Sequence, residues 1–256
     1  MLRVALGEYD IGWHDPETSL RRAEELVLRS TAAAADLVVL PEMCTTGFTM
    51  ESGEQSESLN GDSVRRLADL ARAQEVHLLA GVATREGEGG QEGFYNSALL
   101  FDPAGEVVAH YRKQKLFVYA REQHHYSPGD APVVVDVKGV RLAPFICFDL
   151  RYPELFRAVA PEVDAMLLIA NWPAARRPHW DILTRARAIE NQAYVVGVNR
   201  VGTGGDLDYA GDSRIIDPLG EILAGAATTE SILLADLTTD HVASVRDHFR
   251  FLQDRR

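Results

Sequence analysis

Residues 144–154 read Pro-Phe-Ile-Cys-Phe-Asp-Leu-Arg-Tyr-Pro-Glu, an apolar strand pattern that ends at a cysteine and gives way within a few residues to a helix start. Pro153 suits the first turn of that helix, because a first-turn residue needs no intrahelical N–H partner. On both sides of this stretch, short apolar runs alternate with helical patterns and hairpin turns. This alternation predicts a layered α/β fold with a mixed sheet system.

The expected elements follow one another along the whole chain without a linker or repeat, so we expect one domain over residues 1–256. Residues 113–130 are polar and irregular, which favours a functional loop. Residues 87–93 and 202–205 are glycine-rich and are expected to form a loop tip and a flexible loop. Strands are expected at 2–7, 36–40, 76–83, 94–101, 107–111, 133–137, 140–148, 164–170, 194–201, 214–216, 221–223 and 231–237, and helices at 18–35, 62–74 (with Asp62 as N-cap), 153–160, 180–192 and 240–249.

The composition restricts the classes of protein that the chain can belong to. Hydrophobic residues make up 46% of the 256 positions, which excludes intrinsic disorder, and the two cysteines are too few for a disulfide scaffold. A net charge of −12 makes nucleic acid a poor partner, because phosphate binding needs clustered Lys and Arg. No apolar run approaches the roughly 18 residues of a membrane span, and the first residues lead into a strand pattern without a signal sequence. We therefore expect a cytoplasmic protein that binds neither nucleic acid nor membrane.

Motifs for several common cofactors, and for the nucleophilic serine of serine hydrolases, are absent. The sequence has no GxxxxGK[ST], no GxGxxG after a strand, no GxSxG, and neither CxxC nor HExxH. His124 and His125 are adjacent, but neighbours in sequence rarely face one ligand, so a solvated or substrate-facing loop is preferred to a metal site. We expect neither a metal nor an organic cofactor.

Three expected strands end in residues that carry chemistry. Glu42 follows the buried run Leu-Val-Val-Leu-Pro, where partial burial would raise the pKa of a general base. Lys113 ends Tyr-Arg-Lys, where its ammonium could meet developing negative charge. Cys147 precedes a helix start, whose dipole favours a thiolate and whose N–H groups can bind an oxyanion. Singly, these residues are also explained as a loop carboxylate, a surface charge and a core thiol; together they form an acyl-transfer constellation.

At these positions the chain resembles the nitrilase, or carbon–nitrogen hydrolase, superfamily. The Glu–Lys–Cys triad of that family looks like Glu42, Lys113 and Cys147, in the family's order and at spacings that suit it. Glu122, in the loop after Lys113, looks like a second glutamate of the family. The resemblance covers essentially the whole chain and implies a four-layer α-β-β-α sandwich that assembles into a homodimer or a higher homo-oligomer.

Further stretches resemble the ω-amidase branch of the superfamily: Asn-Trp-Pro at 171–173, Thr-Thr-Gly-Phe at 45–48 and Gly-Asp-Ser-Arg at 211–214. The deaminated-glutathione amidase branch usually reads Pro-Ser-Ala-Phe near Asn171, and this chain does not. The resemblance implies hydrolysis of the terminal amide of small dicarboxylate monoamides, such as 2-oxoglutaramate and succinamate. A nitrilase or an N-carbamoyl amidase on the same scaffold stays open, as does a non-catalytic binding protein that retains the fold.

The resemblance also implies a role for each catalytic residue. Cys147 attacks the amide carbonyl and forms a thioester, while Glu42 moves the protons. Lys113 and the backbone N–H of Phe148 stabilise the tetrahedral oxyanion. Glu122 orients Lys113 or the substrate amide.

A substrate with a remote carboxylate needs a cation away from the scissile carbonyl. Arg151 is the preferred candidate, with Arg176 or Arg177 as further ones, and a salt bridge inside the fold is the alternative role for Arg151. Asn171 and Trp172 complete the expected substrate-binding residues.

Overall fold

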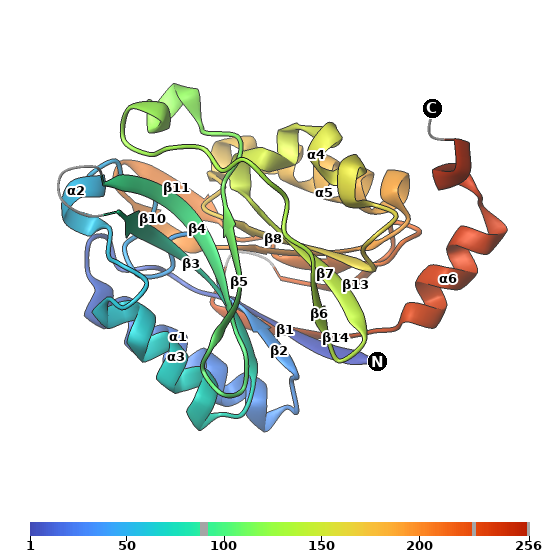
Figure 1. Cartoon of the computed structure of the whole chain (residues 1–256), viewed down its shortest axis with the longest axis horizontal. Helices are drawn as coiled ribbons and strands as arrows, with labels where there is room; N and C mark the ends of the chain where they lie inside the picture. The colour runs from blue at the N-terminus through green and yellow to red at the C-terminus, as the bar shows by residue number, and fades with distance from the viewer. Residues whose placement is uncertain (88–91, 227–228, 255–256) are drawn as a thin grey trace.

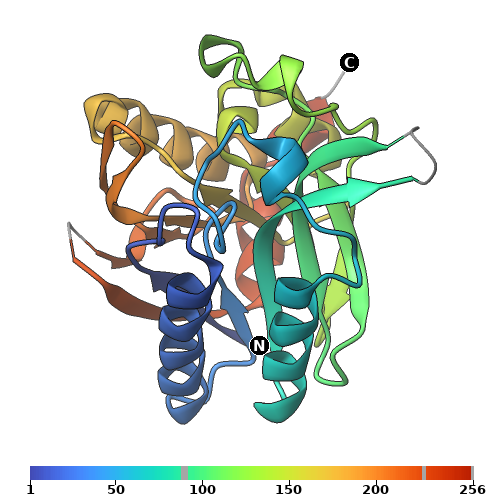
Figure 2. The ribbon, with the colours of Figure 1, turned by 90° about the vertical axis from the view of Figure 1, so that its left-hand side faces the viewer.

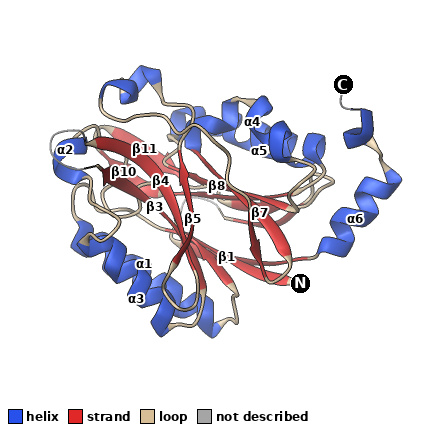
Figure 3. Cartoon of the chain, in the orientation of Figure 1, coloured by secondary structure: helices blue, strands red, loops and turns tan. Residues whose placement is uncertain are grey.

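The computed structural model describes residues 1–87, 92–226 and 229–254, so the middle of the expected loop tip at 88–91 lies outside the described residues. Within them, two six-stranded sheets lie face to face, with helices on their outer faces (Figure 1; Figure 3). The first sheet has the order β14-β1-β2-β3-β4-β5 and the second the order β13-β12-β9-β8-β7-β6. The strands of the first are β1 (Leu2–Glu8), β2 (Leu37–Val39), β3 (His77–Glu86), β4 (Gly93–Phe101), β5 (Val107–Arg112) and β14 (Ser231–Leu237). Those of the second are β6 (Val135–Val137), β7 (Val140–Ile146), β8 (Ala165–Ala170), β9 (Tyr194–Asn199), β12 (Arg214–Ile216) and β13 (Ile222–Gly225).

Two helices cover each sheet. Helices α1 (Pro16–Ala32) and α3 (Asp62–Ala73) lie side by side on the first sheet, and Figure 2 shows them on the side of the molecule opposite to α5. Helices α4 (Pro153–Val159) and α5 (Arg177–Asn191) cover the second sheet. The four-layer α-β-β-α sandwich expected from the sequence is thereby confirmed.

The buried strands at the centre of both sheets explain this layering. Strands β1, β2 and β3 run parallel, as do β7, β8 and β9. Parallel strands are covered on both faces, so they read as continuous apolar runs, and every residue of β2, β8 and β9 is buried. The carboxyl ends of such strands meet at one edge of a sheet, and this edge positions the site.

Helix α1 covers the first sheet because its apolar residues recur every three or four positions. Leu20, Ala23, Leu26 and Val27 are buried along this face. The helix begins at Pro16 after its N-cap Asp15, whose side chain accepts a hydrogen bond from the N–H of Thr18.

Several expected elements begin or end up to three residues away from the observed ones, and three differences matter for the local structure. The strand expected at 140–148 ends at Ile146, because Cys147 has φ +44° and opens the 3₁₀ helix η3 (Cys147–Arg151). The stretch expected to be a flexible loop at 202–205 belongs to an antiparallel hairpin of β10 (Val201–Gly204) and β11 (Leu207–Ala210). Helix α3 is capped by Gly61 and starts at Asp62, which was expected to be the cap itself.

The remaining short elements lie in the loops and at the end of the chain. The loop after β5 contains the 3₁₀ helices η1 (Val118–Ala120) and η2 (Glu122–His124). The others are α2 (Ser52–Gln55), η4 (Ala174–Arg176), α6 (Thr239–His248) and η5 (Phe251–Asp254). Among the described residues, no helix is both long and apolar enough to cross a membrane.

Candidate active site

The ends of three strands bring Glu42, Lys113 and Cys147 together. Glu42 lies three residues after β2, Lys113 directly follows β5, and Cys147 directly follows β7. Since β2 and β5 belong to one sheet and β7 to the other, the site lies where the two sheets face each other.

Lys113 is bound between two carboxylates. Its Nζ donates to Oε1 of Glu42 at 3.0 Å and to both carboxylate oxygens of Glu122, each at 3.0 Å. All three side chains are fully buried. Burial alone would lower the pKa of Lys113, but Glu122 and Glu42 outweigh it and raise that pKa above its usual value. Lys113 is therefore a fixed positive charge in the site.

Two asparagines hold the carboxylate of Glu42 in place. Nδ2 of Asn96, on β4, donates to Glu42 at 2.7 Å and to Glu122 at 3.0 Å. The backbone N–H of Asn171, which follows β8, donates to the other oxygen of Glu42 at 2.7 Å. Sequence reasoning missed Asn96, although a polar residue within the strand sequence Phe-Tyr-Asn-Ser-Ala-Leu-Leu-Phe was a signal of a buried polar partner.

Cys147 lies beside these buried residues and is itself only partly buried. Its Sγ lies 3.9 Å from the carbonyl oxygen of Asn171, so Asn171 contacts both Cys147 and Glu42. Burial raises the pKa of the Cys147 thiol well above its usual value, and the charge of Glu42 raises it further. The charge of Lys113 acts in the opposite direction. The raised pKa is opposite to the shift that the helix-start argument predicts, so attack by the thiol calls for a base.

Asp149 fixes the turn that presents Cys147. One of its oxygens accepts from the Tyr111 hydroxyl at 2.7 Å and from the N–H of Ile146 at 2.9 Å, and the other from the N–H of Lys115 at 2.8 Å. Burial raises the pKa of Asp149 to about 6. These bonds join the end of β7 to the end of β5, and the sequence pattern did not reveal them.

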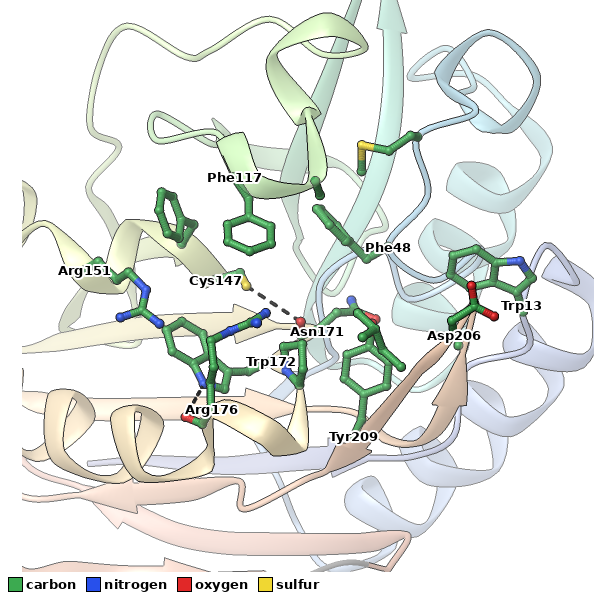
Figure 4. A pocket seen from close by; sticks show the side chains of 17 residues that line it. Trp13, Phe48, Phe117, Cys147, Arg151, Asn171, Trp172, Arg176, Asp206 and Tyr209 are labelled. Atoms are coloured by element: carbon green, nitrogen blue, oxygen red, sulfur yellow. Dashed lines mark hydrogen bonds between the residues drawn. The ribbon is translucent and has the colours of Figure 1, made fainter.

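The thiol opens into a cavity of about 250 Å³. Figure 4 shows Cys147 between Phe117 and Asn171, with Trp172 below it. The walls are mostly apolar, and the aromatic side chains among them include Trp13, Phe48 and Tyr209. A small apolar cavity with few polar groups is typical of a small-molecule site.

The structure places the expected substrate-binding residues in this cavity. Phe148, Arg151, Asn171 and Trp172 all line it, and so does Arg176. Arg151 lies with its guanidinium carbon 4.8 Å above the Trp172 ring. Its Nη2 lies 3.1 Å from Nδ1 of His179. Among the described residues Arg151 has no carboxylate partner, so the alternative role in a salt bridge inside the fold is not observed.

Arg177 has a different role from its neighbour Arg176. Its guanidinium binds the carboxylate of Asp212 through two nitrogens. Because this pair satisfies Arg177 and Arg177 is not among the residues that line the cavity, it is a structural cation.

Asn199, a further residue missed from the sequence, holds the segment after β8. Its Oδ1 accepts from the N–H of Trp172 at 2.7 Å, and its Nδ2 donates to the Trp172 carbonyl at 3.0 Å. This fixes Trp172 in the cavity wall. Among the described residues, no group of three or more His, Cys, Asp or Glu side chains is placed to hold a metal ion.

Comparisons with known proteins agree with this geometry. The family model described as carbon–nitrogen hydrolase matches residues 3–247. The chain is 40% identical over 256 residues to the omega-amidase YafV of Escherichia coli (strain K12). The match covers 99% of this chain and 96% of that protein. It is 32% identical over 252 residues to the 2-oxoglutaramate amidase of Bacillus subtilis (strain 168), covering 97% of this chain and 95% of that protein.

Solved structures show the same architecture. A CN-hydrolase superfamily protein from Xanthomonas campestris, with an arsenic adduct in its active site, superposes with a TM-score of 0.93 at 33% identity and covers 100% of this chain and 97% of that one. A mutant amidase from Nesterenkonia sp. AN1, showing Michael addition of acrylamide at its active site cysteine, has a TM-score of 0.87 at 27% identity, with coverage of 100% and 97%.

Proposed function

Because the chain belongs to the carbon–nitrogen hydrolase family and is a hydrolase acting on amides, we propose that its substrates are small dicarboxylate monoamides such as 2-oxoglutaramate and succinamate. The observation that carries this proposal is the cavity, where Cys147 shares the walls with the guanidinium groups of Arg151 and Arg176. A carboxylate at the far end of the substrate would bind there, and the terminal amide would lie at the thiol. Relatives named omega-amidase and 2-oxoglutaramate amidase support the same substrate class.

In the first half of the reaction, Sγ of Cys147 attacks the amide carbonyl while Glu42 takes the thiol proton. The raised pKa of the thiol supports this coupling, because proton transfer must accompany the attack. The carbonyl electrons move to the oxygen, where the ammonium of Lys113 and the backbone N–H of Phe148 stabilise the oxyanion. Glu42 then protonates the nitrogen, the C–N bond breaks, and ammonia leaves a thioester on Cys147.

In the second half, Glu42 takes a proton from water as the water oxygen attacks the thioester carbonyl. The tetrahedral intermediate collapses with cleavage of the C–S bond, and the proton returns to Sγ. The products are the dicarboxylic acid and the original thiol. Glu122 stays bound to Lys113 throughout and orients its ammonium.

The test is ammonia release from 2-oxoglutaramate and succinamate, beside a short nitrile, an N-carbamoyl amino acid and the neutral amide butyramide. We expect the two acids to have the highest kcat/KM, because a charge-assisted contact contributes about 1.5–3 kcal/mol, or roughly 10–150-fold. Preference for the nitrile or the carbamoyl compound would assign the chain to another activity of the family.

Two cysteine variants control this assay. Cys147→Ala should abolish ammonia release, whereas Cys44→Ala should retain it, because Cys44 is buried in the core and burial raises its pKa to about 12. Ammonia release by Cys147→Ala above a tenth of the wild-type rate would contradict the role of the thiol.

A further inference from the structure

Two guanidinium groups line the cavity without a carboxylate partner. The hydrogen-bond partner of Arg151 is His179, and Arg176 lies with its guanidinium carbon 5.1 Å from the centre of the Phe117 ring. In the described part of the chain, neither makes an ion pair, although acidic residues outnumber basic ones by 38 to 26. Arg177, the residue next to Arg176, binds Asp212 through two nitrogens. The positive charge inside the cavity is therefore left for a ligand.

One substrate carboxylate cannot neutralise both groups. Burial lowers the pKa of Arg151, and the charge of Arg176 lowers it further, which indicates that the two cations repel each other. A carboxylate bound by Arg151 through two parallel hydrogen bonds leaves the donors of Arg176 for a neighbouring acceptor.

One acidic residue also lines the cavity, but it lies away from the two guanidinium groups. Among the described residues this is Asp206, between β10 and β11. Figure 4 shows it beside Trp13, across the cavity from Arg151 and Arg176. It is exposed, so solvent and salt screen its charge, and it forms no ion pair with either guanidinium group.

We propose that Arg176 selects the group on the carbon next to the substrate's free carboxylate, favouring a 2-oxo group and rejecting an α-ammonium group. This inference rests on the function proposed above and assigns a specificity residue to it. A guanidinium has five donors and no acceptor, so it can bind a keto oxygen. It repels an ammonium group, which also has only donors and carries the same charge.

Three substrates of equal length test the proposal, because they differ only at this carbon. Glutaramate carries a methylene group there, 2-oxoglutaramate a ketone and L-glutamine an ammonium group. For the wild type we expect kcat/KM to be highest for 2-oxoglutaramate and lowest for L-glutamine, with at least roughly a tenfold gap between glutaramate and L-glutamine.

Two substitutions of Arg176 separate its charge from its hydrogen bonds. Arg176→Met should raise the ratio of L-glutamine to glutaramate on the order of tenfold and lower the ratio of 2-oxoglutaramate to glutaramate. Arg176→Lys keeps the charge and should still reject L-glutamine. The control Arg21→Met removes an exposed arginine from α1 and should leave all ratios unchanged.

Two outcomes would overturn the proposal while leaving the proposed function standing. One is a wild type that hydrolyses L-glutamine as well as glutaramate. The other is an Arg176→Met variant that is active on glutaramate with unchanged ratios. A wild type that releases no ammonia from glutaramate or 2-oxoglutaramate would instead contradict the proposed function itself.

Discussion

Replacement of Lys113 by methionine separates charge balance from catalysis. Lys113→Met removes the ammonium group bound to Glu42 and Glu122 and leaves two buried carboxylates without a cation. Breaking a buried ion pair from one side costs about 3–5 kcal/mol, because the remaining charge is uncompensated. We therefore expect this loss in the free energy of unfolding, together with a fall in kcat on the order of 10³-fold or more.

A second substitution distinguishes the two effects. Adding Glu122→Gln to Lys113→Met removes one of the two stranded charges, so most of the lost stability should return. Activity should not return, because no cation faces the oxyanion. Urea denaturation measures the stability and ammonia release the activity. The reasoning would be refuted by a double variant with activity within tenfold of the wild type, or by a Lys113→Met variant that loses less than about 1 kcal/mol.

Two further predictions concern single substitutions of the buried carboxylates Glu8 and Glu122. Burial raises the pKa of Glu8 from 4.5 to about 7, so its contribution to stability is complete below pH 4.5 and is lost as the pH rises through 7. Glu8→Gln should match the wild type in thermal or urea unfolding at pH 4.5 and exceed it by about 3 kcal/mol at pH 9, and a difference that does not grow with pH would contradict this. Glu122→Gln should lower kcat at least roughly tenfold with little change in KM, because it weakens the orientation of Lys113; an unchanged kcat would show that Glu122 only balances charge.

Local patterns predicted a layered α/β fold and the strand ends that carry Glu42 and Cys147. The resemblance to the family supplied the four-layer arrangement and the expected roles of these residues. Apolar runs that end at Glu42 and Cys147 mark strand ends, and parallel strands bring such ends together. The thiol pKa could not be predicted in the same way, because it depends on burial in the folded chain and on Glu42, which follows a strand of the other sheet. Asn96 was missed for a similar reason: its partners Glu42 and Glu122 are distant in sequence.

The hairpin of β10 and β11 could not be predicted from the local sequence. Its glycines indicate a loop, but Gly202 pairs with Tyr209 across two strands and the hairpin becomes a wall of the cavity. The roles of Arg176 and Arg177 were likewise indistinguishable in the sequence, since only the fold places Asp212 beside Arg177.

The covalent thioester on Cys147 is the central claim, and rapid quenching followed by intact mass measurement tests it most directly. The enzyme is mixed with excess succinamate, quenched in acid during turnover, and digested to locate any added mass. The account predicts an adduct with the mass of the succinyl group on the peptide containing Cys147, removable by hydroxylamine and absent from Cys147→Ala. Two results would contradict the account. One is steady ammonia release by the wild type when no adduct is found in either the wild type or Glu42→Gln. The other is an adduct on a residue other than Cys147.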